Sequence, residues 1–182
     1  MTRMENTKQA VGSNLNTQLL KGADDLVRGA GDGRISKLDA EKILHILRVG
    51  NTYTTREKET IDHLYNHYHW TDAGLTWFKS ELEGWIAVFE QPIQMTPAEI
   101  SQQHFSADDV LASPTDREVR EHGLRSATNE TYLDHDDITL IVRLANGQRV
   151  AVTTNFIELA GAFVELKGGH DIPLRAVEKV EI

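Results

Sequence analysis

DGRISKLD, residues 32–39, is the segment that most constrains the architecture of this chain. Gly33 can adopt a positive φ, which ends a preceding helix, and Ser36 is a favoured N-cap residue. Asp39 stands three residues after Ser36, where an acidic side chain closes a capping box. The segment therefore predicts the junction of two helices. The first ends at the glycine cluster of residues 29–33, and the second begins after Ser36.

A related segment, DAGLT at residues 72–76, lies 40 residues later and is followed by Glu81 as the first is by Glu41. Apolar residues recur with helical spacing on both sides of each segment. A third helix is expected to begin after Thr54 or Thr55 and to end near Trp70, and a fourth to begin at Thr76. Residues 1–90 are therefore expected to form a four-helix domain of two helix-loop-helix units.

This plan resembles an EF-hand pair over residues 15–90. The residues that match the family's loop at positions five, six, eight, nine and twelve are Asp32, Gly33, Ile35, Ser36 and Asp39. The resemblance implies a short antiparallel bridge between the two loops. It also implies a calcium site to which Asp32, Ser36 and Asp39 contribute oxygen ligands.

The loops depart from the EF-hand pattern at positions that calcium needs. Arg28 and Ala30 stand at positions one and three, and Lys79 ends the second loop, so too few oxygens remain for six to eight ligands. We expect a metal-free, EF-hand-like domain, although a shifted loop with Asp24 or Asp25 would restore some ligands. Residues 23–47 also resemble the helical tellurite-resistance family, a second interpretation of the same motif.

Three histidines form the best-spaced transition-metal motif of the chain. His63 and His67 are four residues apart on a predicted helix and share one face, and His69 follows just after it. The motif is compatible with zinc or another transition metal. The alternative is that these histidines are solvated residues near a helix C-terminus, where the dipole favours a positive charge. No glutamate lies between them in the manner of a hydrolytic zinc motif.

The last fifty residues show strand alternation. Apolar and polar residues alternate over residues 138–144, and Asn146-Gly147 then predicts a tight hairpin with a return strand at residues 149–154. Residues 155–159 are expected to form a turn or a short helical turn. Further strands are expected at residues 162–166, 171–174 and 176–182. These strands predict a five-stranded antiparallel barrel over residues 137–182.

Such a barrel resembles SH3-like and Sm-like domains, and the segment at residues 163–180 resembles their closing half. The same layout is similar to that of Rho-binding antitermination regulators. Arg143, Arg149 and Arg175 are candidates for a basic strip that contacts a partner. The resemblance leaves open whether that partner is a nucleic acid or, as we expect, a protein.

A bridging segment at residues 91–136 connects the two domains. It contains three prolines and three helix-start signals, at Thr96, Ser106 and Ser113, so short helices are expected there. The expected organisation is α+β, with an EF-hand-like domain at residues 1–90, a helical bridge at 91–136 and a small β-barrel at 137–182.

The charge distribution restricts the partners. The net charge is −9, and 11 basic and 13 acidic residues in residues 1–90 contrast with 8 and 15 in residues 91–182. This acidity disfavours nucleic acid and favours a basic protein partner on the C-terminal half. The chain has no cysteine and no long apolar run, so thiol chemistry and a membrane span are not expected. We expect a cytoplasmic protein.

No catalytic motif stands out. The glycine cluster at residues 29–33 lacks the Lys-Ser/Thr of a phosphate-binding loop and follows a helix instead of a strand. The leading hypothesis is a non-catalytic protein-interaction module without a cofactor. The alternative is a protein that responds to calcium or a transition metal, and a weaker third possibility is an enzyme with its site between the domains.

Overall fold

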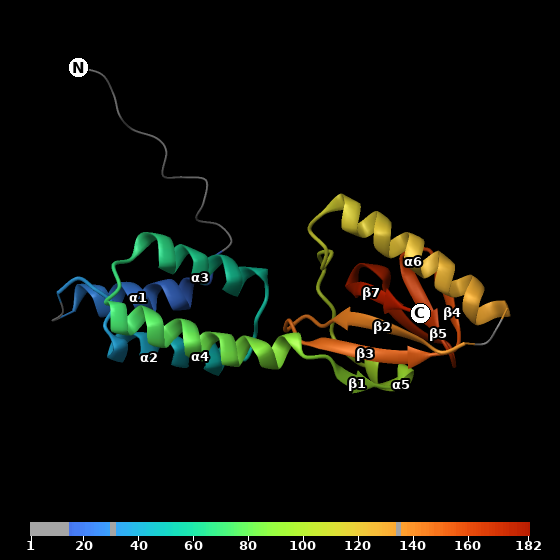
Figure 1. Ribbon diagram of the computed structural model, residues 1–182, viewed down its shortest axis with the longest axis horizontal. Coiled ribbons are helices and arrows are strands. Elements are labelled where there is room, and N and C mark those ends of the chain that lie inside the picture. Colours follow the sequence, from blue (N-terminus) through green and yellow to red (C-terminus); the bar gives the residue numbers. More distant parts are fainter. Residues whose placement is uncertain (1–14, 30–31, 134–135) are drawn as a thin grey trace, which may run out of the picture. The chain divides into compact units, whose positions relative to one another are not determined.

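The computed structural model describes residues 15–29, 32–133 and 136–182, shown in Figure 1. The chain divides into two compact units, residues 1–86 and residues 87–182. The described residues contain six α-helices and two β-sheets of four and three strands. The predicted α+β class is therefore confirmed. None of the helices in these described ranges is long and apolar enough to cross a membrane.

The first unit, here called the helical unit, contains four helices and no strand among its described residues. Its helices are α1 (Thr17–Arg28), α2 (Lys37–Gly50), α3 (Thr55–His67) and α4 (Asp72–Glu90), the last of which continues into the second unit. The buried apolar residues of this unit include Leu19, Ile35, Ile43, Leu44, Leu64 and Phe78. The helices thus enclose a hydrophobic core of their own.

The predicted capping box at the start of α2 is present. Ser36 Oγ accepts a hydrogen bond from the backbone N–H of Asp39 at 3.3 Å, and Asp39 Oδ2 accepts the backbone N–H of Ser36 at 3.1 Å. Thr54 and Glu57 form a second capping box at the start of α3. The Ser36–Asp39 and Thr54–Glu57 contacts therefore fix both helix starts, at positions that the local sequence predicted.

The second loop differs from the prediction, because α4 begins at Asp72 instead of Thr76. Thr71 provides the start signal, since its Oγ1 accepts the N–H of Gly74 at 3.1 Å. Ile35 forms a bridge with Trp70, and this bridge is parallel, whereas the EF-hand resemblance implies an antiparallel one. The segment at residues 72–76 is thus helical, and the two halves of the repeat are not structurally equivalent.

The second unit, here called the β unit, contains every described strand. Its elements are β1 (Ile93–Met95), α5 (Pro97–Ile100), α6 (Pro114–Leu133), β2 (Ile138–Arg143), β3 (Arg149–Thr154), β4 (Ile157–Ala160), β5 (Phe163–Leu166), β6 (His170–Pro173), the 3-10 helix η1 (Leu174–Ala176) and β7 (Val177–Glu181). The sheets have the strand orders β1-β3-β2-β7 and β4-β5-β6.

The hairpin prediction at Asn146-Gly147 is confirmed. β2 and β3 pair antiparallel, with Leu140 opposite Val152, and Gly147 adopts a φ of 91°. A positive φ of this kind is what the turn requires of its glycine.

The β unit departs from the predicted barrel in several ways. Residues 157–160 form a strand instead of a turn, so six strands instead of five lie between residues 138 and 181. β1 adds a parallel partner to β3, and the sheets of the described residues do not close into one barrel. In the predicted bridge, Ser106 starts no helix and α6 has 20 residues. Residues 134–135 of that bridge lie outside the described ranges.

Both sheets share one core with α5 and α6. The core contains Leu140, Val142 and Val152 from the larger sheet and Ile157, Val164 and Ile172 from the smaller one. Ile100 of α5 and Leu124 and Ala127 of α6 are packed into it. The smaller sheet therefore buries one face, whereas Glu158, Phe163 and Asp171 on its other face are exposed.

Candidate functional site

The residues predicted to bind calcium are engaged in local contacts. Asp32 accepts hydrogen bonds from Arg34 Nε at 2.8 Å and from the Arg34 backbone N–H at 3.0 Å, and the Arg34 hydrogen bond lowers the pKa of Asp32. Ser36 and Asp39 bond to each other in the capping box, with Oγ donating to Oδ2 at 2.7 Å. Ala30, at loop position three of the prediction, lies outside the described residues.

The three predicted transition-metal residues are not all brought together. The rings of His63 and His67 stack with centroids 4.0 Å apart. The backbone carbonyl of His69 accepts the Ile35 N–H at 2.7 Å, and the His69 side chain is exposed. Within the described ranges, no group of three His, Asp or Glu side chains is arranged to hold a metal ion.

Burial and charge act in opposite directions around His63. Burial lowers the pKa of His63, the neighbouring His67 lowers it further, and the carboxylate of Asp24 acts against both. Asp24 also accepts the Tyr68 hydroxyl at 2.6 Å. Burial and this hydrogen bond raise the pKa of Tyr68 to about 12. The net effect on His63 is a lowered pKa, which favours the neutral imidazole.

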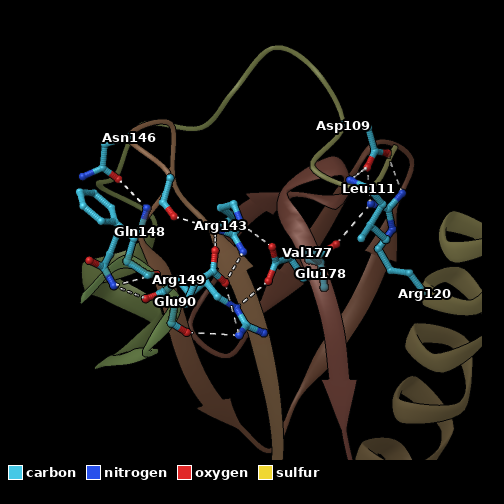
Figure 2. Close-up of polar contacts among 12 residues, drawn as sticks. Glu90, Asp109, Leu111, Arg120, Arg143, Asn146, Gln148, Arg149, Val177 and Glu178 are labelled. Carbon is cyan, nitrogen blue, oxygen red and sulfur yellow. Dashed lines mark hydrogen bonds and ion pairs between the residues drawn. The ribbon is translucent and has the colours of Figure 1, made fainter. Parts of the chain in front are cut away.

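Two of the three predicted partner-binding arginines meet in a charge cluster (Figure 2). Arg143 donates to both carboxylate oxygens of Glu90 at 3.1 Å and to Glu178 Oε1. Arg149 donates to Glu178 Oε2 at 2.8 Å and to the backbone carbonyl of Glu90 at 3.2 Å. The two guanidinium groups thus face carboxylates, and the cluster fixes the last turn of α4 to the β2–β3 hairpin.

A β-bulge accounts for the position of Glu178. The β2–β7 register shifts between Ile141 and Val142, which pair with Lys179 and Val177, so Glu178 is the additional residue of β7. A bulge re-aims the side chain of its extra residue, here toward both arginines. Burial acts to lower the pKa of Arg143, but the hydrogen bonds from Arg143 to Glu90 and Glu178 outweigh it. The pKa of Arg143 is therefore raised. Neither Glu90 nor Glu178 belongs to a motif that the sequence alone distinguishes.

The third predicted arginine lies elsewhere, and a fourth arginine is buried. Arg175 donates from Nε to the Ser106 carbonyl at 2.8 Å, and no contact joins it to the cluster in the described residues. Arg120 on α6, which the sequence did not single out, donates to both carboxylate oxygens of Asp109 at 2.9 and 2.8 Å and to the Val177 carbonyl at 3.2 Å. Its side chain is only 2% exposed.

The outer face of the smaller sheet carries three acidic side chains in one row. Glu158 of β4 is opposite Glu165 of β5, which is opposite Asp171 of β6. Side chains directly opposite each other on antiparallel strands have Cβ atoms about 4.5–5.5 Å apart. Among the described residues, no basic side chain forms an ion pair with any of them. We call Glu158, Glu165 and Asp171 the acidic row.

A second row of residues lies beside the acidic row; two of its members, Ala160 and Phe163, are exposed, and the third, Pro173, is buried. Ala160 is opposite Phe163, which is opposite Pro173, and Phe163 is 44% exposed. We call these three the apolar row. Each of its members is two residues along its strand from a member of the acidic row, so the two rows share one face. The sequence predicts a turn at residues 155–159, so it did not predict β4 or this face. The signal that could have indicated the β4–β5 hairpin is Gly161, which has a φ of 64°.

One serine of the β unit lies close to a histidine, as a nucleophile and its base would. Ser101 Oγ lies 3.4 Å from His170 Nδ1. The Ser101 hydroxyl, however, donates to the Ala98 carbonyl at 2.9 Å, and this carbonyl can only accept. The hydroxyl proton therefore does not point to the imidazole, so the pair lacks the geometry of an activated nucleophile.

Comparison of the chain with models of protein families, with characterised proteins and with solved structures found no match.

Proposed function

We propose that the chain is a non-catalytic protein-interaction module whose β unit binds a basic segment of a partner on the outer face of the β4-β5-β6 sheet. The observation that carries this proposal is the acidic row. Three unpaired carboxylates stand opposite one another on adjacent strands. A cationic ligand laid across the strands would contact all three.

The acidic row is costly to the folded chain. Like charges directly opposite each other on a sheet are destabilising, by about 0.2–1 kcal/mol for each pair. The row contains two such pairs, Glu158 with Glu165 and Glu165 with Asp171. A binding site is a physical reason for retaining this repulsion, because a bound cation relieves it.

The apolar row gives the proposed surface its second component. Phe163 is 44% exposed beside the carboxylates, and aromatic residues, phenylalanine included, are enriched at the centres of protein interfaces. The excess of acidic residues in residues 91–182 would attract a basic partner over a longer range. The fitting ligand is therefore a protein segment in which basic and apolar side chains alternate.

We also propose that the two units are related to SH3-like and EF-hand-like domains. Strand β4 begins three residues after β3 ends, and a 3-10 helix precedes the last strand. These features support a relation to SH3-like domains, with β3 and β4 as one bent strand. The helical unit is proposed as an EF-hand-like domain in which only the first helix junction, with its capping box, keeps the family's plan.

Removing the charges of the acidic row should weaken binding and increase stability. The neutral variant Glu158→Gln/Glu165→Gln/Asp171→Asn is titrated with a synthetic peptide of alternating arginine and leucine. We expect its affinity to fall by about tenfold or more. Its free energy of unfolding should rise by about 0.4–2 kcal/mol, because two like-charge pairs are removed. Urea unfolding measures the second effect and shows that the variant folds.

The matched control removes the same charge from exposed positions elsewhere in the β unit. Asp108→Asn/Glu118→Gln/Asp137→Asn should retain most of the affinity, and Phe163→Ala in the original chain should weaken binding of the leucine-containing peptide. Equal losses in the two triple variants would leave only a non-specific charge effect and refute the proposal. If spermine bound as tightly as the peptide, the ligand would be a simple polycation instead of a protein segment, and the proposal would be wrong.

A further inference from the structure

A pair of imidazoles near the end of α3 takes no part in the proposed protein-binding surface. His63 and His67 are four residues apart and therefore lie on one face of the helix. Their rings stack with centroids 4.0 Å apart and planes 16° from parallel. His67 is exposed and His63 is half-buried, so solutes can reach this face of α3.

One ring of the pair is already in the tautomer that a metal requires. His67 Nδ1 lies 3.0 Å from the backbone carbonyl oxygen of His63. A carbonyl oxygen only accepts, so Nδ1 carries the proton and Nε2 presents its lone pair. Metal-binding imidazoles commonly make this second hydrogen bond, which fixes the ring orientation and increases its basicity. His67 Nε2 is therefore a preformed nitrogen ligand.

The surroundings favour a cation. The pair lies in the last turns of α3, where unpaired backbone carbonyls carry partial negative charge. The Tyr68 ring packs edge-on against His63 at 6.4 Å, and its hydroxyl donates to the carboxylate of Asp24 on α1. Arg28, 3.5 Å from the same carboxylate, offsets part of that negative charge.

We propose that His63 and His67 form a two-imidazole site for a divalent transition-metal cation, separate from the protein-binding face. Among the described residues, no third His, Asp or Glu completes a three-ligand group with them, so water fills the remaining positions. Two nitrogens with water suit the tetragonal geometry of Cu²⁺ or Ni²⁺. Cu²⁺ binds more tightly than Ni²⁺ or Zn²⁺, as the general order of divalent affinities requires.

Calorimetric titration of the full chain, without an affinity tag, tests the site with Cu²⁺, Ni²⁺ and Zn²⁺ separately. We expect one equivalent of Cu²⁺ to bind, with a Tm increase of roughly 2–4 °C at about tenfold above the Kd. His63→Asn and His67→Asn should each weaken Cu²⁺ binding by about tenfold or more. Thermal unfolding without metal checks that these variants fold.

The matched controls are His69→Asn and His122→Asn, which change exposed histidines outside the stacked pair. Both should retain the Cu²⁺ affinity, and the electron paramagnetic resonance spectrum of the copper-loaded chain should show nitrogen hyperfine structure that His67→Asn reduces. An unchanged affinity in either His63→Asn or His67→Asn overturns the proposal. A comparable loss in His69→Asn also overturns it, in favour of a three-histidine site.

Discussion

Asp109 and Arg120 form the most deeply buried ion pair of the described residues. Arg120 is 2% exposed and Asp109 is 18% exposed, and both carboxylate oxygens accept hydrogen bonds from the guanidinium group. Taking such charges out of water is costly, so the pair by itself is weak evidence of net stabilisation. Removal of one partner is different, because it leaves a buried charge without compensation.

Asp109→Asn should therefore destabilise the β unit by about 3 kcal/mol at neutral pH. Burial raises the pKa of Asp109, but hydrogen bonds from Arg120 and the Leu111 backbone outweigh it, so the folded-state pKa lies below the ordinary value of 3.8. The stabilisation is therefore fully present above about pH 4 and is lost as the pH falls through the lower, folded-state pKa. Urea unfolding from pH 7 downward should show the difference between the two proteins shrinking in that acidic range.

The control is Asp32→Asn, since Asp32 pairs with Arg34 at an exposed position. Its effect on unfolding should be small, because water screens exposed pairs. If Asp109→Asn were as mild as Asp32→Asn, the buried pair would contribute no more than a surface pair.

At the scale of elements, the junction between α2 and α4 depends on one glycine. A Cβ atom at Gly74 would lie 2.8 Å from the Ile35 carbonyl oxygen and 2.9 Å from the Ser36 carbonyl carbon. Both are backbone atoms, held in place by the Ile35–Trp70 bridge and by the capping box. The start of α4 can therefore approach this segment only because residue 74 has no side chain.

Gly74→Ala should destabilise the helical unit by about 1–3 kcal/mol, because overpacking outweighs the higher helix propensity of alanine. Gly84→Ala lies in the same helix, where a Cβ would meet nothing within 4 Å, and should stabilise by about 1 kcal/mol. Thermal unfolding of the two variants compares them directly. A Tm increase in both would mean that α4 can move away from Ile35 at little cost.

The elements that the sequence predicted are those specified by neighbouring residues. The capping box at Ser36 and the turn at Gly147 each depend on contacts within a few residues, and both are present. The predicted start of α4 at Thr76 was wrong. Thr71, which lies just before the repeated segment, caps the helix instead.

The candidate sites were less predictable because they depend on pairing between strands. The acidic row exists only when three strands align in register, and the bulge that turns Glu178 toward Arg143 arises from a register shift. No local pattern encodes either one. The histidine pair was predictable from its spacing of four residues, but the separate position of His69 was not, because its backbone carbonyl is held by Ile35.

At the scale of the whole molecule, the chain has two hydrophobic cores. Leu64 is fully buried in the helical unit, and Leu140 is fully buried in the β unit. All members of the sheet core belong to residues 87–182, the second compact unit. Domains with a core of their own can unfold as separate cooperative units.

Matched leucine-to-alanine substitutions test this separation by hydrogen exchange. Leu140→Ala should cost the β unit about 2–5 kcal/mol and speed the exchange of its slowest amides, while the slowest amides of residues 15–29 and 32–86 keep their protection. Leu64→Ala should produce the converse pattern. The side chains are identical and fully buried in both cases, so the comparison isolates the unit in which the cavity is made. Loss of protection in both units from either substitution would show a single cooperative structure, because then neither core is stable without the other.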